Sequence, residues 1–102
     1  MKIKRIKKLK VNATTFNVEW DNSHAGASFS YRDHLITFGV RKLTDTELSS
    51  RICHELMEIC ALEMHVRYSR TDCDSDYLFS YDHRQHTTMC EMFAALFEQF
   101  IM

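Results

Sequence analysis

Residues 44–66, TDTELSSRICHELMEICALEMHV, are the stretch of the sequence that decides the fold. Thr44 and Glu47 have the spacing of a capping box, in which a threonine hydroxyl and a glutamate carboxylate satisfy free N–H groups of a first helical turn. Apolar residues then recur every three or four positions, at Leu48, Ile52, Leu56, Ile59 and Leu62. This period predicts a helix over 44–66 with one continuous apolar face.

The residues before this helix have the period of β-structure. Phe16, Val18 and Trp20 alternate with polar residues, as in a strand with one buried face. Turn-prone or polar residues separate the apolar runs. Four strands are expected within the β region 1–40, over residues 4–11, 15–20, 27–31 and 35–40.

The residues after this helix are expected to form a polar loop and a second helix. The loop is predicted over residues 67–81. Asp82 and Gln85 have the spacing of a second capping box, and apolar residues then recur at Met89, Phe93, Leu96, Phe97 and Phe100. A C-terminal helix is predicted over 83–101. Strands first and helices after indicate a single α+β domain over 1–102, with a small antiparallel sheet of N-terminal hairpins packed by two main helices.

Composition excludes several classes of protein. The 102 residues carry a net charge of -1, with 45% hydrophobic and 26% charged residues, as in ordinary soluble domains and unlike a polyanion binder. There is no apolar stretch long enough for a membrane span, and no apolar segment follows the basic start as in a signal peptide. The four cysteines are scattered without C-x-x-C spacing, which favours reduced thiols in a cytoplasm.

The first ten residues are strongly basic and contain no acid. They could form an arm for nucleic acid or a membrane surface, or an edge strand that lysines protect from pairing with other chains. Apolar residues interleave the lysines at Ile3, Ile6 and Leu9, so the edge strand is favoured.

A candidate metal site lies on the predicted helix over 44–66. His54 and Glu58 are four residues apart, which places both on one helical face. Imidazole nitrogen and carboxylate oxygen are both ordinary zinc ligands, and a catalytic site usually has three protein ligands. His83 is expected to be the third ligand, with His86 and Glu91 as alternatives.

Glu55 has a different expected role. In H-E-x-x-H metallopeptidases, the glutamate after the first histidine is the general base that takes a proton from metal-bound water.

His54 lies beside the apolar stripe, where a polar group without compensation is costly.

Two of the acidic candidates also have purely structural interpretations. Glu58 could form an ion pair with Arg51 or Arg67 instead of binding a metal. Glu91 could be the partner of Thr88 in a local helix cap, and this cap is slightly favoured over the ligand role.

The order of these motifs resembles small zincin-like proteins encoded by bacteriophages and prophages. The resemblance covers most of the chain from about Gly26 onward, and it rests on Gly39-Val40, the capped start at Thr44, Ile52-Cys53-His54-Glu55-Leu56-Met57-Glu58, Tyr81-Asp82-His83-Arg84-Gln85 and the terminal helix. It implies a minimal metallopeptidase fold with His54, Glu58 and His83 as ligands and Glu55 as the base. In most such proteins, an aromatic or apolar residue fills the position of His86.

The motif departs from true peptidases at Glu58, where they have histidine. The first hypothesis is nevertheless a zinc-dependent hydrolase of the metallopeptidase kind, with zinc as the cofactor and manganese, iron or nickel as other metals that suit such ligands. The alternative is a catalytically inactive protein that keeps the zincin scaffold to bind a partner. A small nucleic-acid-binding protein using the basic N-terminus is a third and weaker hypothesis. Peptide or protein is the expected substrate or partner, in a host cytoplasm if a phage encodes the chain.

Overall fold

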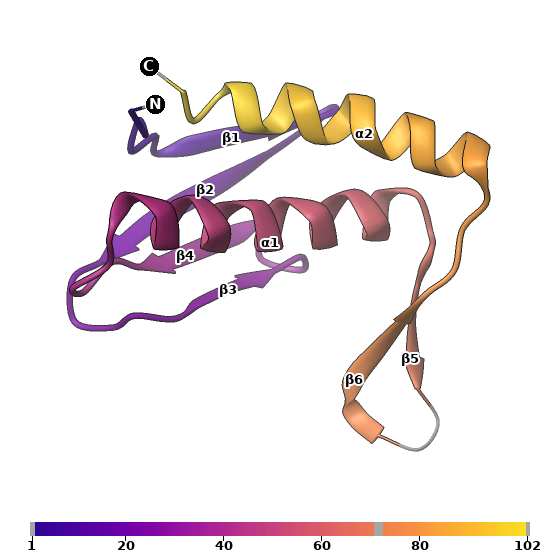
Figure 1. Ribbon diagram of the computed structural model, residues 1–102, viewed down its shortest axis with the longest axis horizontal. Helices are drawn as coiled ribbons and strands as arrows, with labels where there is room; N and C mark the ends of the chain where they lie inside the picture. The colour runs from indigo at the N-terminus through magenta and orange to yellow at the C-terminus, as the bar shows by residue number, and fades with distance from the viewer. Residues whose placement is uncertain (1, 71–72, 102) are drawn as a thin grey trace.

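The computed structural model describes residues 2–70 and 73–101, with the side chains of residues 2–68 and 77–101. The elements in chain order are β1 (Lys8–Val11), β2 (Thr14–Asp21), β3 (Ala27–Ser30), β4 (Leu35–Gly39), α1 (Asp45–Glu63), β5 (Arg67–Arg70), β6 (Cys73–Phe79) and α2 (His83–Glu98) (Figure 1). The α+β class predicted from the sequence is confirmed. No helix among the described residues is long and apolar enough to cross a membrane.

The first four strands form one sheet in the order β1-β2-β4-β3. The β1–β2 and β3–β4 pairs are antiparallel hairpins, as expected, but β2 and β4 pair in parallel, with Val18 opposite Ile36. The sheet is therefore mixed, and the expectation of a purely antiparallel sheet was wrong. The loop after β2 crosses the end of β4, so β3 forms the outer edge of the sheet. Strand β4 then lies between β2 and β3 and pairs with both.

Both helices cover the same face of this sheet (Figure 1). Helix α1 contacts β3, helix α2 contacts β1, and the two helices pack on each other. The side chains that fill the space between sheet and helices are fully buried, and they include Leu9, Val11, Phe16, Ile36, Phe38, Ile52, Leu56, Ile59 and Phe100. The apolar face predicted for α1 is thus the face that forms the core.

Both predicted capping boxes are present. The Glu47 N–H donates to Oγ1 of Thr44 over 3.2 Å, and the Gln85 N–H donates to Oδ1 of Asp82 over 2.9 Å. Each cap fixes where its helix begins, because it satisfies N–H groups that have no partner inside the helix.

The interpretation of residues 67–81 as a polar loop was wrong. Strands β5 and β6 form an antiparallel hairpin there, with Tyr68 opposite Leu78, and it extends away from the helices and the larger sheet (Figure 1). Tyr68, Leu78 and Phe79 have the β-propensity of aromatic and apolar residues, and the polar residues between them concealed the pattern.

The basic N-terminal stretch contains an edge strand, as predicted. In β1, Leu9 and Val11 are buried while Lys8 and Lys10 are exposed. The outer backbone of β1 is partly occupied, because the Lys10 N–H donates to Oε1 of Gln99 and Nε2 of Gln99 donates to the Lys10 carbonyl, both over 2.9 Å. These bonds tie the strand to the end of α2 and limit pairing with another chain.

The three described cysteine side chains, Cys53, Cys60 and Cys90, are free cysteines. The side chain of Cys73 lies outside the described residues.

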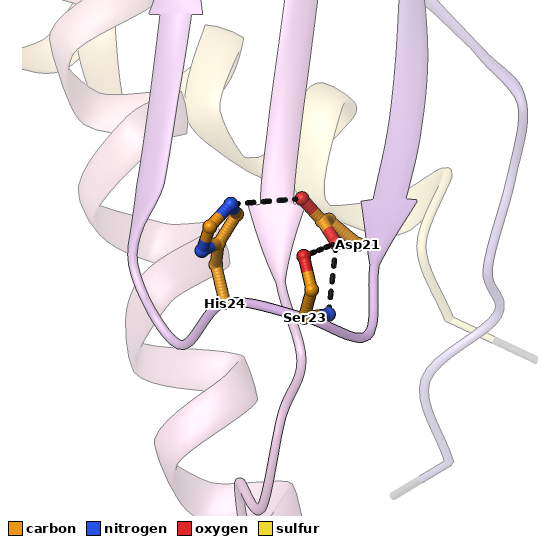
Figure 2. A network of polar contacts seen from close by, with 3 residues as sticks. All are labelled: Asp21, Ser23 and His24. Carbon is orange, nitrogen blue, oxygen red and sulfur yellow. Dashed lines mark hydrogen bonds and ion pairs between the residues drawn. The ribbon is translucent and has the colours of Figure 1, made fainter.

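The loop between β2 and β3 is held by Asp21. Its carboxylate accepts hydrogen bonds from the N–H and hydroxyl of Ser23 over 2.8 and 2.6 Å, and it lies 3.5 Å from Nε2 of His24 (Figure 2). This loop crosses directly over Gly39, whose N–H donates to the Gly26 carbonyl over 2.6 Å. A Cβ at Gly39 would lie 2.5 Å from the Gly26 oxygen and 2.6 Å from the His24 oxygen.

We expect Gly39→Ala to destabilise the fold by about 1–3 kcal/mol, because backbone must move to admit the new methyl group. Gly26→Ala is the matched control. A Cβ there meets nothing within 4 Å, so its effect should stay within about 0.5 kcal/mol. Urea denaturation of both variants measures the difference, and equal stabilities would contradict the close approach.

Candidate metal centre

Helix α1 presents three of the predicted site residues around a single cavity. His54, Glu55 and Glu58 all line an opening of about 660 Å³. The opposite walls come from strand β3 with its following turn, and from the β5–β6 hairpin, which contribute Ala27, Ser28, Phe29, Tyr31, Arg67 and Tyr77. The cavity therefore lies where α1, the edge of the larger sheet and the hairpin meet.

His54 and Glu58 lie together, as the helical spacing predicts. Nε2 of His54 is 3.7 Å from Oε1 of Glu58. A zinc ion with bonds of about 2.0–2.2 Å would hold two such ligand atoms roughly 3.4 Å apart in a tetrahedral site. The observed separation of 3.7 Å is about 0.3 Å longer than this spacing.

The surroundings of His54 differ from the expectation. It was expected to bear a cost beside the apolar stripe, but its side chain is 67% exposed. His54 lies at the margin of the buried face of α1, so its side chain points away from the core. Its exposure leaves the ring accessible to a ligand.

Glu55 is the buried member of the set. Its residue exposure is only 5%, and it is flanked on the core face of α1 by Ile52, Leu56 and Ile59. Burial raises the pKa of the Glu55 carboxyl, which is further raised by Glu58 and lowered by His54 and Arg67. A carboxyl with a raised pKa is better matched to proton transfer near neutral pH than an ordinary glutamate.

Arg67 contributes a positive charge to the same cavity. Its Nη1 lies 3.8 Å from Oε2 of Glu58, and its side chain is 14% exposed. Of the two arginines considered as partners of Glu58, the structure places Arg67 beside it. The carboxylate of Glu58 thus lies between His54 on one oxygen and Arg67 on the other.

The other predicted ligands lie on α2 and are exposed. His83 is the first residue of the helix, and its ring is 6.4 Å from the ring of His86. His86 stacks on Tyr81 with ring centroids 5.9 Å apart, and its Nε2 is 3.6 Å from Sγ of Cys90. Across residues 2–70 and 73–101, no three histidine, cysteine or acidic side chains gather into a metal-binding group.

Glu91 does not form the predicted local cap. Thr88 lies inside α2, and its hydroxyl donates to the Arg84 carbonyl over 3.2 Å. The helix begins at His83 with Asp82 as its cap, so Thr88 is not at a helix start. The cap interpretation of Glu91 was therefore wrong.

A second, more apolar cavity adjoins the first. Its volume is about 280 Å³, and it shares His54 and Glu58 with the larger cavity. Its other walls are Met57, Ala61, Phe79, Tyr81 and Met89. Tyr81 precedes α2 and Met89 lies within it, whereas His83 lines neither this cavity nor the larger one.

Comparison with known proteins adds no relative to this description. The chain matches no protein-family model, no curated protein and no solved structure. The resemblance to zincin-like phage proteins thus stays a prediction from the motifs.

Sequence reasoning missed most of the cavity wall. Phe29, Tyr31 and Tyr77 were not among the candidates, and Arg67 was considered only as a partner of Glu58. Phe29 and Tyr31 come from the edge of the larger sheet and reach α1 through long-range packing, whereas Arg67 and Tyr77 come from the hairpin that follows α1 and was predicted to be a loop. No local spacing marks them.

We expect the stability of the metal-free protein to depend on Glu55 and on pH. The pKa of Glu55 is higher in the folded protein than its ordinary value of 4.5, so the folded state holds this proton more tightly than the unfolded chain. The resulting stability is present below pH 4.5 and is lost as the pH rises through the folded pKa.

Glu55→Gln should therefore melt at a higher temperature than the wild type at about pH 8, and this advantage should disappear near pH 4. Thermal unfolding followed by circular dichroism in EDTA measures the difference. Glu98→Gln, at an exposed position on α2, is the control. A Glu55→Gln effect that does not change with pH would contradict the burial of an ionisable carboxyl.

Proposed function

We propose that the protein is a zinc-dependent hydrolase of the metallopeptidase kind, acting on amide bonds of peptides or proteins. One observation carries the proposal: Nε2 of His54 lies 3.7 Å from Oε1 of Glu58, and both residues line one cavity with the buried Glu55. A zinc ion bound there would lower the pKa of water to about 7 and polarise a carbonyl.

Glu55 is the base in this proposal. Its carboxyl opens on the cavity and has a raised pKa, so it can take a proton from an attacking water and deliver it to a leaving amine. The burial of Glu55 among core residues fixes its position, which is what a proton-transferring group requires.

The third ligand is proposed to be His83. Tyr81 lines the cavity that His54 and Glu58 share, which supports an approach of His83 from the adjoining start of α2. His86 is the alternative, but its ring already stacks on Tyr81 and contacts Cys90. Manganese, iron or nickel remain alternatives to zinc for such a ligand set.

Zinc titration of the purified protein tests the ligand set. We expect His54→Ala and Glu58→Gln to lower zinc affinity by more than ~100-fold. Loss of a residue that only hydrogen-bonds to a metal ligand already lowers metal affinity by about 10–100-fold. His83→Ala should weaken zinc binding and His86→Ala should not. His24→Ala, at the loop bound to Asp21, is the histidine control. Equal zinc affinity of wild type and His54→Ala would exclude the site.

Turnover tests the role of Glu55 separately. Glu55→Gln should keep its zinc affinity within a few-fold of wild type and lose about 10²–10⁴-fold in the hydrolysis of a fluorogenic peptide library, because only proton transfer is removed. Zinc-dependent hydrolysis that survives Glu55→Gln would contradict its role as base.

A second candidate function is a binding protein that keeps this scaffold without turnover. Exposed apolar side chains next to the site favour it, since Met57, Phe79 and Tyr81 are 53%, 43% and 44% exposed around the smaller cavity. This candidate predicts no hydrolysis by the wild type and partner binding that Glu55→Gln leaves unchanged.

A further inference from the structure

Arg67 is held in a fixed orientation at the wall of the main cavity. The carbon at the centre of its guanidinium lies 3.7 Å from the centroid of the Tyr77 ring and 5.9 Å from that of Phe29. Aromatic rings on strands β6 and β3 thus contact an arginine that begins β5. Stacking of this kind fixes the plane of the guanidinium and leaves its N–H edge available for hydrogen bonds.

The contact of Arg67 with Glu58 is long. Its 3.8 Å separation exceeds the roughly 2.7–2.9 Å of a charge-assisted hydrogen bond, so the two groups attract without a bidentate bond. A planar guanidinium matches the two oxygens of a carboxylate, and this geometry is better satisfied by an incoming carboxylate than by Glu58.

The charge of the cavity, once a metal ion is bound, also favours an incoming carboxylate. The formal charges of Glu55, Glu58 and Arg67, which line this cavity, sum to one net negative charge. A divalent ion at His54 and Glu58 would reverse this to one net positive charge. It would also draw Glu58 from Arg67, so the loaded cavity would favour an anionic group beside the guanidinium.

We propose that Arg67 anchors a carboxylate of the substrate, so that the substrates are peptides with a carboxylate close to the amide bond that is cut. This inference rests on the proposed function. The carboxylate is either the C-terminus of the peptide or an aspartate or glutamate side chain. Both present the same planar pair of oxygens to the guanidinium.

Three small probes separate these sources. N-acetyl-phenylalanine carries a terminal carboxylate, N-acetyl-glutamate α-amide carries only a side-chain carboxylate, and N-acetyl-phenylalanine amide carries none. Their dissociation constants are measured on the zinc-loaded protein from NMR shifts of backbone amides. At least one carboxylate probe should bind at least ~10-fold more tightly than the amide probe, because it gains charge-assisted hydrogen bonds to the guanidinium.

Arg67→Gln should abolish this preference, and Arg67→Lys should retain only part of it, because lysine keeps the charge but lacks the planar fork. Arg41→Gln, at an exposed position before α1, is the matched control and should keep the full preference. An unchanged preference in Arg67→Gln would overturn the proposal, because the carboxylate would then bind the metal or another group.

A metal-free arm separates this inference from the proposed function. In EDTA, Glu58→Gln removes the carboxylate beside Arg67, so it should prefer the carboxylate probes several-fold more strongly than metal-free wild type. The double variant Glu58→Gln/Arg67→Gln should lose that gain. If Glu58→Gln gains no preference for the carboxylate probes in EDTA, the role of Arg67 is overturned even if zinc binds. If the preference is gained but the protein does not bind zinc, only the proposed function is overturned.

Discussion

The carboxylate of Glu55 is the one charged group that is buried among the described side chains, and the arrangement around it follows from the cost of burying it. Removing a carboxylate from water is expensive unless opposite charge or protonation compensates. Here the raised pKa reflects the burial, while His54 and Arg67 act in the opposite direction. A fold that served stability alone would have an apolar residue at this position on α1. A raised pKa at a buried carboxyl is typical of groups that transfer protons, which supports the proposed role of Glu55 as base.

Helix α1 serves both the core and the cavity because their faces overlap. Ile52, Leu56 and Ile59 pack into the space above the sheet, while His54 and Glu58 lie on the adjoining side of the helix. Glu55 lies at the border, so the packing that orders α1 also positions the carboxyl. The other walls of the cavity come from the edge strand β3 with its following turn and from the hairpin that carries Arg67 and Tyr77. A rigid helix thus supplies the proposed ligands and base, and the hairpin supplies the charge that faces them.

Local signals in the sequence predicted the features that local interactions create. The capping boxes at Thr44 and Asp82, the apolar period of α1 and the His54–Glu58 pair each depend on a few neighbouring residues. The parallel pairing of β2 with β4 was not predictable in this way, because only packing of distant segments decides it. The β5–β6 hairpin was concealed by its polar residues. The burial of Glu55 had a signal, since position 55 continues the apolar period between Ile52 and Ile59. Glu55 was predicted to be the base from its place after His54, and its burial was not predicted.

We propose that His54 and Glu58 hold a metal ion whose third ligand comes from the start of α2. Anomalous diffraction at the zinc edge, from crystals of the protein grown with zinc, tests this claim most directly. The account predicts a single strong peak within about 2.2 Å of Nε2 of His54 and of a Glu58 oxygen, with the ring of His83 as the third ligand. A peak that lies elsewhere, such as between His86 and Cys90, with none at His54 and Glu58, would contradict it.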